Sequence, residues 1–235
     1  MGEDIRRQVA VIVPAMNEEE RIGAVLRAIV GCKLANEIIV VDDGSSDATS
    51  SVAAKYPNVR VLRLSVNRGK GGAMLEGARA TRAGILTFVD ADLAGLRSDH
   101  VDRIIAPLLA DECDMCVGIF RGGKVWSDAA QRVSPYLSGQ RALRRELFEA
   151  VPFIGELRMG VEVALNLAAR RRKARILRVV LRGVSNCYQE KKRGLVKGTT
   201  ARLRMWGEIG QAVVKTRPRR RFRDRPSRWR WPHGP

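Results

Sequence analysis

The stretch Ile85-Leu-Thr-Phe-Val-Asp-Ala-Asp-Leu93 decides the fold. Five mostly apolar, β-prone residues run directly into two carboxylates one residue apart, which is typical of a buried strand followed by a loop. Asp90 and Asp92 would then lie at the carboxyl end of the strand, where ligands bind in an open parallel sheet. Two neighbouring carboxylates repel each other unless a positive charge lies between them. A divalent cation that also holds a diphosphate would supply that charge, and a helix N-cap or a solvated turn is the structural alternative.

Strands and helices are predicted to alternate along the first half of the chain. Apolar runs predict strands, and helical periodicity with capping residues predicts a helix after each of the first four. This alternation predicts right-handed βαβ units, and therefore an α/β fold with a Rossmann-like, mainly parallel sheet covered by helices on both faces. The predicted strands are 8–13, 37–41, 59–64, 85–89 and 114–119, and the predicted helices start at residues 17, 47, 73 and 98 or 99.

Polar side chains follow each of the first four predicted strands, at the point where the strand ends. Because the carboxyl ends of parallel strands meet at one edge of a sheet, these side chains should line one shared cleft. A random distribution over the surface would not produce this grouping. The residues are Asn17 and Glu18 after the first strand, Asp42 and Asp43 after the second, residues 67–72 after the third, and Asp90 and Asp92 after the fourth.

Two of these groups suit a nucleotide. Ionised Asp42 and Asp43 can only accept hydrogen bonds, and an acid at the end of an early strand commonly binds ribose hydroxyls or a base N–H. Asp43 could instead stabilise the turn at Gly44. The segment Asn67-Arg-Gly-Lys-Gly-Gly72 supplies a glycine-rich helix entry and a cation, which suit a base or a phosphate. With the two carboxylates after the fourth strand, these groups predict a site for a metal-bound nucleoside diphosphate.

The net charge of +18 is unevenly distributed. Residues 215–235 carry one Lys, eight Arg and a single Asp. Because such a segment cannot bury a core, we expect residues 216–235 to be a disordered arginine-rich tail. The tail could bind nucleic acid or an anionic membrane surface, and Trp229 and Trp231 between arginines fit a membrane–water interface. A solvated tail is the alternative.

The remaining composition fits one domain. The chain has 235 residues, 45% of them hydrophobic, which is enough for a sizeable core. No apolar run approaches the ~18 residues of a membrane helix, and the polar N-terminus lacks a signal-peptide apolar region, so we expect a cytoplasmic location. Cys113 and Cys116 form a C-x-x-C pair, but within a strand they would face opposite sides, which argues against a metal or redox site.

Four motifs carry a resemblance to a known family. They are Val9-Ala-Val-Ile-Val-Pro-Ala-Met-Asn-Glu-Glu19, Val40-Val-Asp-Asp-Gly-Ser-Ser-Asp47, Asn67-Arg-Gly-Lys-Gly-Gly-Ala73 and Phe88-Val-Asp-Ala-Asp92. In order and spacing they resemble family 2 glycosyltransferases with the GT-A fold. Within that family the chain most resembles the dolichol- or polyprenyl-phosphate sugar transferases, and less closely the glucosyl-3-phosphoglycerate synthases. The resemblance implies one domain over residues 1–215, with a nucleotide-sugar half (1–120) and an acceptor half (121–215).

The resemblance also implies roles for individual residues. The donor nucleotide would be held by Pro14, Asn17, Glu18, Asp42, Asp43, Lys70, Asp90 and Ala91. Asp90 and Asp92 would bind Mg²⁺ or Mn²⁺ with the diphosphate, and Asp92 and Glu162 are the candidate catalytic residues. Glu162 could instead be one polar position on an amphipathic helix. Relatives often place a metal-binding His where this chain has Asn186, whose amide oxygen is a candidate but weaker ligand.

The acceptor half carries weaker motifs. Residues 117–124 resemble the segment after strand five of the lipid-phosphate enzymes, and residues 137–147 resemble their acceptor-side Ser-Gly-Phe-Arg segment, although the stretch between the two is shorter here. An acceptor phosphate is already ionised at pH 7 and needs cations rather than a general base. The candidate acceptor-binding residues are Arg121, Ser138 and Arg141, with Lys124 and Arg132 as further cations.

These features predict a metal-dependent transfer of a hexosyl group from a nucleotide sugar to a phosphorylated acceptor such as polyprenyl phosphate, with phosphoglycerate as the soluble alternative. The apolar residues of segment 199–214 recur at helical spacing beside the basic tail, and two weak attachment signals predict peripheral association with the inner face of the membrane. The same apolar face could instead pack on the domain. Nucleic-acid binding is disfavoured because the cleft motifs are acidic. A sugar nucleotidyltransferase is disfavoured because it would require a glycine-rich signature after the first strand, where this chain has Pro14-Ala-Met-Asn17.

Overall fold

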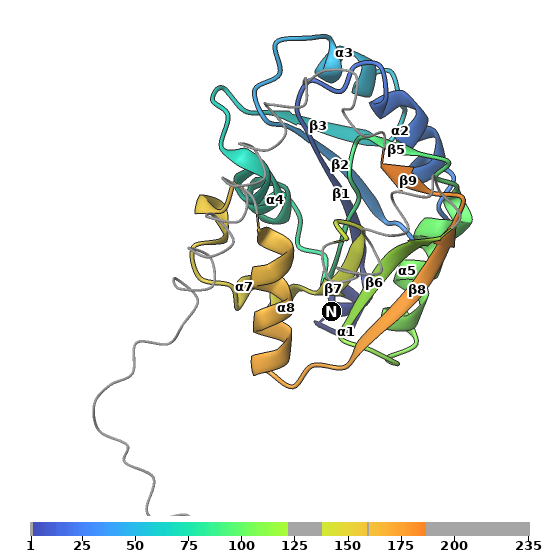
Figure 1. Ribbon diagram of the computed structural model, residues 1–235, viewed down its shortest axis with the longest axis vertical. Coiled ribbons are helices and arrows are strands. Elements are labelled where there is room, and N and C mark those ends of the chain that lie inside the picture. The colour runs from blue at the N-terminus through green and yellow to red at the C-terminus, as the bar shows by residue number, and fades with distance from the viewer. Residues whose placement is uncertain (1, 122–137, 159, 187–235) are drawn as a thin grey trace, which may run out of the picture.

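The computed structural model describes residues 2–121, 138–158 and 160–186 (Figure 1). Its main sheet has seven described strands in the order β3-β2-β1-β4-β7-β6-β8. All neighbouring strands are parallel except β7, which runs antiparallel to both β4 and β6. The predicted mainly parallel sheet is therefore confirmed. The strands are β1 (Val9–Ala15), β2 (Glu37–Asp42), β3 (Val59–Arg63), β4 (Ile85–Phe88), β6 (Met115–Arg121), β7 (Arg141–Arg144) and β8 (Ile176–Arg182).

Helices cover both faces of this sheet (Figure 1). Successive residues of a strand face opposite sides, so Val9 and Val11 enter one core cluster while Ala10 and Ile12 enter the other. The first cluster is covered by α2 (Ile22–Val30), α3 (Thr49–Ala53) and α5 (Ser98–Leu109), and the second by α4 (Gly69–Arg79), α7 (Arg145–Glu149) and α8 (Val161–Arg171). The remaining elements are α1 (Gly2–Arg7), the 3₁₀ turn η2 (Ile154–Glu156) and a small sheet of β5 (Leu93–Ala94) with β9 (Ser185–Asn186). Among the described residues, no helix is long and apolar enough to cross a bilayer.

Three local expectations are corrected. The second helix begins at Ile22 rather than Asn17, because Asn17 adopts a left-handed φ of 55° that a helix cannot contain. The helix expected from residue 73 begins at Gly69, so that the glycine-rich segment forms its first turn. Cys113 precedes β6, and both Cys113 and Cys116 pack in the same core cluster instead of facing opposite sides.

Gly71 lets α4 approach η2 closely. Its N–H donates to the carbonyl oxygen of Leu157 at 2.9 Å. A Cβ atom at this position would overlap the backbone oxygens of Ile154 and Leu157, which cannot swing aside as a side chain can. The first turn of α4 therefore depends on a residue without a side chain.

We predict that Gly71→Ala lowers the free energy of unfolding by about 1–3 kcal/mol, because the methyl group forces α4 away from η2. Chemical denaturation monitored by circular dichroism measures this. Gly23→Ala is the matched control in the first turn of α2, since the nearest atom to its new Cβ is the Tyr56 hydroxyl at 3.2 Å, the far end of a flexible side chain. The control should be neutral or slightly stabilising. Equal losses in both variants would contradict this account.

Candidate active site

Four charged side chains from different elements form what we call the ion cluster: Lys70, Asp90, Arg141 and Glu162. Lys70, in the first turn of α4, places Nζ 2.7 Å from Oδ1 of Asp90 and 2.6 Å from Oε1 of Glu162. Asp90 follows β4, and Glu162 lies in the first turn of α8. Arg141 begins β7, and its Nη1 donates to the backbone oxygen of Glu162 at 3.4 Å. The cluster joins both halves of the chain.

The charges in this cluster stabilise one another. Burial alone would lower the pKa of Lys70, but the carboxylates of Asp90 and Glu162 outweigh it and raise that pKa. Burial alone would raise the pKa of Glu162, yet Lys70 and Arg141 hold it below its usual value. Burial lowers the pKa of Arg141 despite the two nearby acids. Glu162 thus faces the cations of the cluster, and its catalytic role stays a prediction.

A second group of acids lies beside the cluster. Burial, followed by the charges of Asp90 and Glu18, raises the pKa of Asp92 to about 6. A carboxyl group in this state has too little positive charge near it, which is the condition that a divalent cation relieves. Asn186 pairs with Leu93, the residue after Asp92, across β5 and β9. The backbone pairing thus places Asn186 opposite the residue that follows Asp92, and its part in metal binding stays a prediction.

The donor set fits a cation that is shared with a ligand. Within residues 2–121, 138–158 and 160–186, no three side chains of Asp, Glu, His or Cys converge closely enough to enclose a metal ion by themselves. Mg²⁺ usually takes one or two carboxylates and completes its shell with phosphate oxygens and water. Asp90 and Asp92 match that requirement.

Asp42 and Asp43 both turn into the protein. Asp42 is fully buried at the end of β2, and its carboxylate accepts from the N–H of Ser45 at 2.8 Å and from the Ser50 hydroxyl. Asp43 accepts from the N–H groups of Arg68 and Gly69 at 2.7 and 2.8 Å. Burial raises the pKa of Asp43, and these two donors partly offset that rise. Asp43 thus accepts from the first N–H groups of α4 rather than from its own turn at Gly44.

The N-terminus of α4 is not an open phosphate site. Besides the two N–H groups bound by Asp43, the N–H of Lys70 donates to the carbonyl oxygen of Arg158 at 3.3 Å, and that of Gly71 donates to Leu157. The helix entry predicted to suit a phosphate through its backbone is therefore occupied by the protein's own acceptors. Since these backbone N–H groups are bound internally, the side chain of Lys70 is the group of this segment that could contact a ligand.

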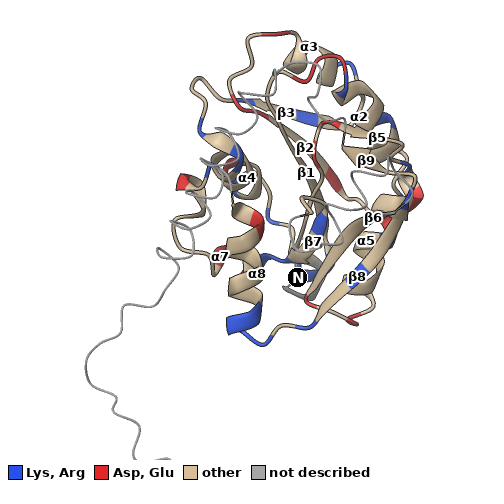
Figure 2. Cartoon of the chain, in the orientation of Figure 1, with Lys and Arg blue, Asp and Glu red and all other residues tan. Residues whose placement is uncertain are grey.

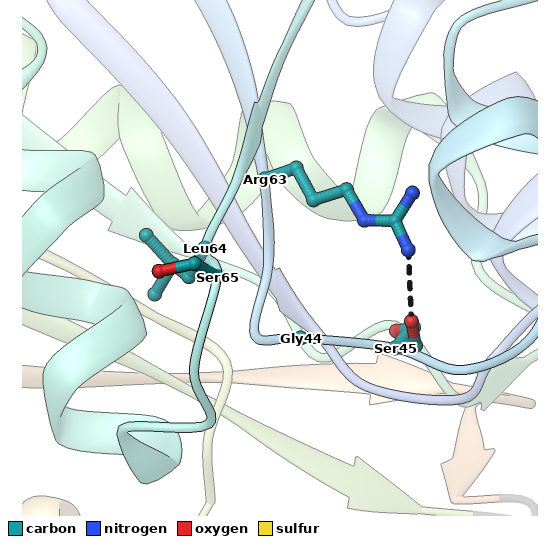
Figure 3. A pocket seen from close by; sticks show the side chains of 5 residues that line it. All are labelled: Gly44, Ser45, Arg63, Leu64 and Ser65. Atoms are coloured by element: carbon teal, nitrogen blue, oxygen red, sulfur yellow. Dashed lines mark hydrogen bonds between the residues drawn. The ribbon is translucent and has the colours of Figure 1, made fainter.

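A pocket of about 420 Å³ opens between the loops that follow β2 and β3, lined by Gly44, Ser45, Arg63, Leu64 and Ser65 (Figure 3). Arg63 reaches across it and donates to the backbone oxygen of Ser45 at 3.1 Å, with Nε 3.8 Å from Oδ2 of Asp42. Arg63 was not among the predicted site residues. The predicted strand 59–64 already contained it, and the parallel pairing of β2 with β3 places it opposite Asp42.

The other predicted donor residues lie along the same edge. Pro14 pairs with Val41 near the end of β1. The side chain of Asn17 accepts from the N–H of Ser46 at 2.9 Å, so it ties the loop after β1 to the loop after β2. Glu18 forms an ion pair with Arg21 at 2.5 Å, and Ala91 is buried between Asp90 and Asp92.

The acceptor candidates are described in part. Ser138 is buried, and its hydroxyl contacts the carbonyl oxygen of Gly118. Arg141 is fully buried in the ion cluster, so both residues contact the protein's own groups. Arg121 ends β6, but its side chain lies outside the described residues. Lys124 and Arg132, the segment 199–214 and the arginine-rich tail also lie outside them.

Comparisons with known proteins agree with this arrangement. The family model described as glycosyl transferase family 2 matches residues 10–166. A dolichyl-phosphate beta-glucosyltransferase of Drosophila melanogaster is 46% identical over 108 residues, covering 40% of this chain and 33% of the relative. A glucosyl-3-phosphoglycerate synthase of Mycolicibacterium smegmatis is 31% identical over 193 residues, covering 68% of this chain and 63% of the relative. The chain thus spans less than two thirds of the length of either relative.

Solved structures extend the similarity to most of the chain. The crystal structure of glucosyl-3-phosphoglycerate synthase from Mycobacterium tuberculosis in complex with Mn²⁺, uridine diphosphate and glucosyl-3-phosphoglycerate has a TM-score of 0.70 and 27% identity, covering 88% of this chain and 80% of that one. The same protein in complex with Mg²⁺ and uridine diphosphate has a TM-score of 0.70 and 26% identity, covering 89% and 79%. By sequence and by fold, the chain belongs to glycosyl transferase family 2 and has the GT-A architecture.

Proposed function

We propose that this protein is a metal-dependent hexosyltransferase that moves a sugar from a nucleotide sugar to a phosphorylated acceptor. The observation that carries this proposal is the pair of carboxylates at the end of β4, where Asp90 contacts the cationic Lys70 at 2.7 Å and burial, with the charges of Asp90 and Glu18, raises the pKa of Asp92. A metal-bound diphosphate brings a cation for the acids and phosphate oxygens for the lysine. Similar proteins have been crystallised with Mn²⁺ or Mg²⁺ and uridine diphosphate.

The site residues divide the chemistry between them. When bound, Mg²⁺ or Mn²⁺ stabilises the diphosphate that leaves the sugar. Asp90 and Asp92 would hold the ion, with Asn186 as a further ligand through its amide oxygen. Lys70 neutralises negative charge that develops on the donor side. Glu162, ionised and inward-facing, is proposed to orient the sugar, since a carboxylate accepts hydrogen bonds from sugar hydroxyls.

The nucleotide itself is proposed to bind along the ends of β1 and β2. The supporting geometry is the shared edge formed there by the loops after the two strands, tied together by Asn17. Asp42 and Asp43 are proposed to act on the nucleotide mainly by fixing the loops around it, because both are occupied by internal donors. The proposed donor-binding set remains Pro14, Asn17, Glu18, Asp42, Asp43, Lys70, Asp90 and Ala91.

Polyprenyl phosphate and phosphoglycerate are the two candidate acceptors. Both present an ionised phosphate, so both need cations rather than a general base. The proposed acceptor-binding set is Arg121, Ser138 and Arg141. The greater coverage of the chain by the synthase, 68% against 40%, favours a phosphoglycerate-like acceptor, because that alignment extends into residues beyond 120.

The domain boundaries and the location of the protein are part of the same proposal. Residues 1–215 would form the catalytic domain, with the donor half at 1–120, the acceptor half at 121–215 and a basic tail at 216–235. A polyprenyl-phosphate acceptor would require peripheral attachment to the cytoplasmic face of a membrane. Binding to nucleic acid receives no support from the described fold, where acidic and basic residues are interspersed apart from the basic end of α8 (Figure 2).

The metal assignment predicts that Asp92→Asn lowers the transfer rate by about 100-fold or more, because the variant loses an anionic ligand of the ion that would stabilise the leaving diphosphate. Sugar release from a panel of nucleotide sugars, in Mn²⁺ and in excess EDTA, measures this. Asp99→Asn is the matched control, since Asp99 is an exposed acid outside the site. An active Asp92→Asn enzyme, or full wild-type activity in EDTA, would refute the assignment.

The nucleotide assignment predicts weaker binding of uridine diphosphate by Asp42→Ala in calorimetry. The carboxylate makes charge-assisted hydrogen bonds worth about 1.5–3 kcal/mol each, so its loss frees the loop after β2. Ser50→Ala removes one of those bonds and keeps the charge, so its effect should be smaller. Unchanged affinity in Asp42→Ala would show that the loop does not contribute to nucleotide binding.

The membrane assignment predicts that the full chain sediments with anionic vesicles at low salt and is released at high salt, because salt screens the basic residues. A chain ending at Lys215 is the control and should remain in the supernatant. Equal sedimentation of both chains would exclude the tail as the anchor. If neither sediments, a soluble acceptor is the better assignment.

A further inference from the structure

Gln140 is a polar side chain buried next to the proposed metal site, with only 1% of its surface exposed. Its position follows from the topology. β7 pairs antiparallel with β4, so that Phe88 lies opposite Arg141. Residues immediately before β7 therefore lie beside residues immediately after β4, and Gln140 faces Asp90. Gln140 lies within the segment 137–147 that resembles the acceptor-side motif, but it was not among the predicted site residues.

Gln140 and Asp90 form a direct hydrogen bond. Nε2 of Gln140 donates to Oδ2 of Asp90 at 2.8 Å. Because an ionised carboxylate only accepts, the amide nitrogen must face Asp90, and the amide oxygen then faces Ser138. The Ser138 hydroxyl lies 3.0 Å from that oxygen. The backbone of Gln140 is also fixed, since its carbonyl oxygen accepts from the N–H of Gly118 in β6 at 2.9 Å.

Gly139 brings this segment against the same carboxylate. A Cβ atom on Gly139 would overlap both carboxylate oxygens of Asp90. The backbone thus packs directly on Asp90, while Lys70 binds Oδ1 and Gln140 binds Oδ2. The orientation of this carboxylate is determined on three sides by groups of the protein.

We propose that Gln140 is a positioning residue that fixes the Asp90 carboxylate in the orientation used to bind the metal–nucleotide complex. This inference rests on the proposed function. A neutral amide suits the task, because it donates a hydrogen bond without adding charge. A second lysine here would compete with the metal for Asp90, and a carboxylate would repel Asp90. Ser138 supports the amide from the opposite side.

The test compares two Gln140 variants with a matched control. Gln140→Met keeps the length and volume of the side chain but removes the donor, and Gln140→Glu replaces the donor with a charged acceptor. Tyr56→Phe is the matched control, since it removes one hydrogen-bond donor, to the backbone oxygen of Gly23 at 2.7 Å, outside the proposed site. Calorimetry measures the affinity for uridine diphosphate with and without Mn²⁺, and thermal unfolding measures stability.

We expect Gln140→Met to weaken binding of uridine diphosphate in the presence of Mn²⁺ by about tenfold, the value of one hydrogen bond to a charged group. Binding without metal should change less than about twofold. Gln140→Glu should lose more of the affinity measured with Mn²⁺, because its carboxylate repels Asp90. This variant supplies the test if Gln140→Met does not fold. Tyr56→Phe should change neither mode of binding by more than about twofold.

The outcomes separate this inference from the function on which it rests. If the wild-type protein binds uridine diphosphate no better with Mn²⁺ than without it, the proposed function and this inference both fail. If the wild-type protein shows the metal effect and both Gln140 variants retain it in full, only the positioning role is overturned. A merely structural role would lower the melting temperature and weaken both modes of binding equally, and that result would also overturn the proposal.

Discussion

The ammonium group of Lys70 lies between two carboxylates that come from opposite halves of the chain, and the arrangement of the site depends on this contact. Asp90 follows the fourth parallel strand, whereas Glu162 lies in the first turn of α8, in the second half of the chain. Removing Lys70 would leave two partly buried acids with only one nearby cation, which costs more than an exposed ion pair is worth. Arg141 provides a second cation below the same acids. The donor half and the acceptor half are therefore coupled electrostatically as well as through the sheet.

Much of the donor side could be predicted from sequence because its signals are local. A short apolar run ending in Asp90 and Asp92 identifies both a strand and its loop, and the parallel alternation places such loops at one edge. Contacts between distant segments carry no comparable signal. β7 has four residues, too few to show a periodicity, so neither its insertion beside β4 nor the position of Gln140 could be read in advance. For Glu162 the sequence left two interpretations open, a catalytic acid or one polar position on an amphipathic helix. Its contact with Lys70 joins segments far apart in the chain and has no local signal.

The first turn of α4 shows why a motif and its use can differ. A glycine-rich helix entry with a lysine predicts backbone N–H groups open to a phosphate, yet Asp43 and the carbonyl groups next to η2 already accept from them. The glycines serve close packing, as Gly71 does against Leu157. The anion-binding capacity of the segment is left to the long side chain of Lys70, which reaches further than a backbone amide and is oriented by Asp90 and Glu162.

The antiparallel β7 also governs the order in which the molecule can be completed. It fills the space between β4 and β6, so a ribosome that has released only the first 120 residues has produced the group β3-β2-β1-β4 and nearly all of β6, without the strand that joins them. Each of the two then presents an unpaired edge, which is a known hazard for association with other chains. The Asp90 carboxylate acquires its full set of neighbours only when the late strand is inserted. The donor half is thus contiguous in sequence, but it depends on a later segment for its assembly.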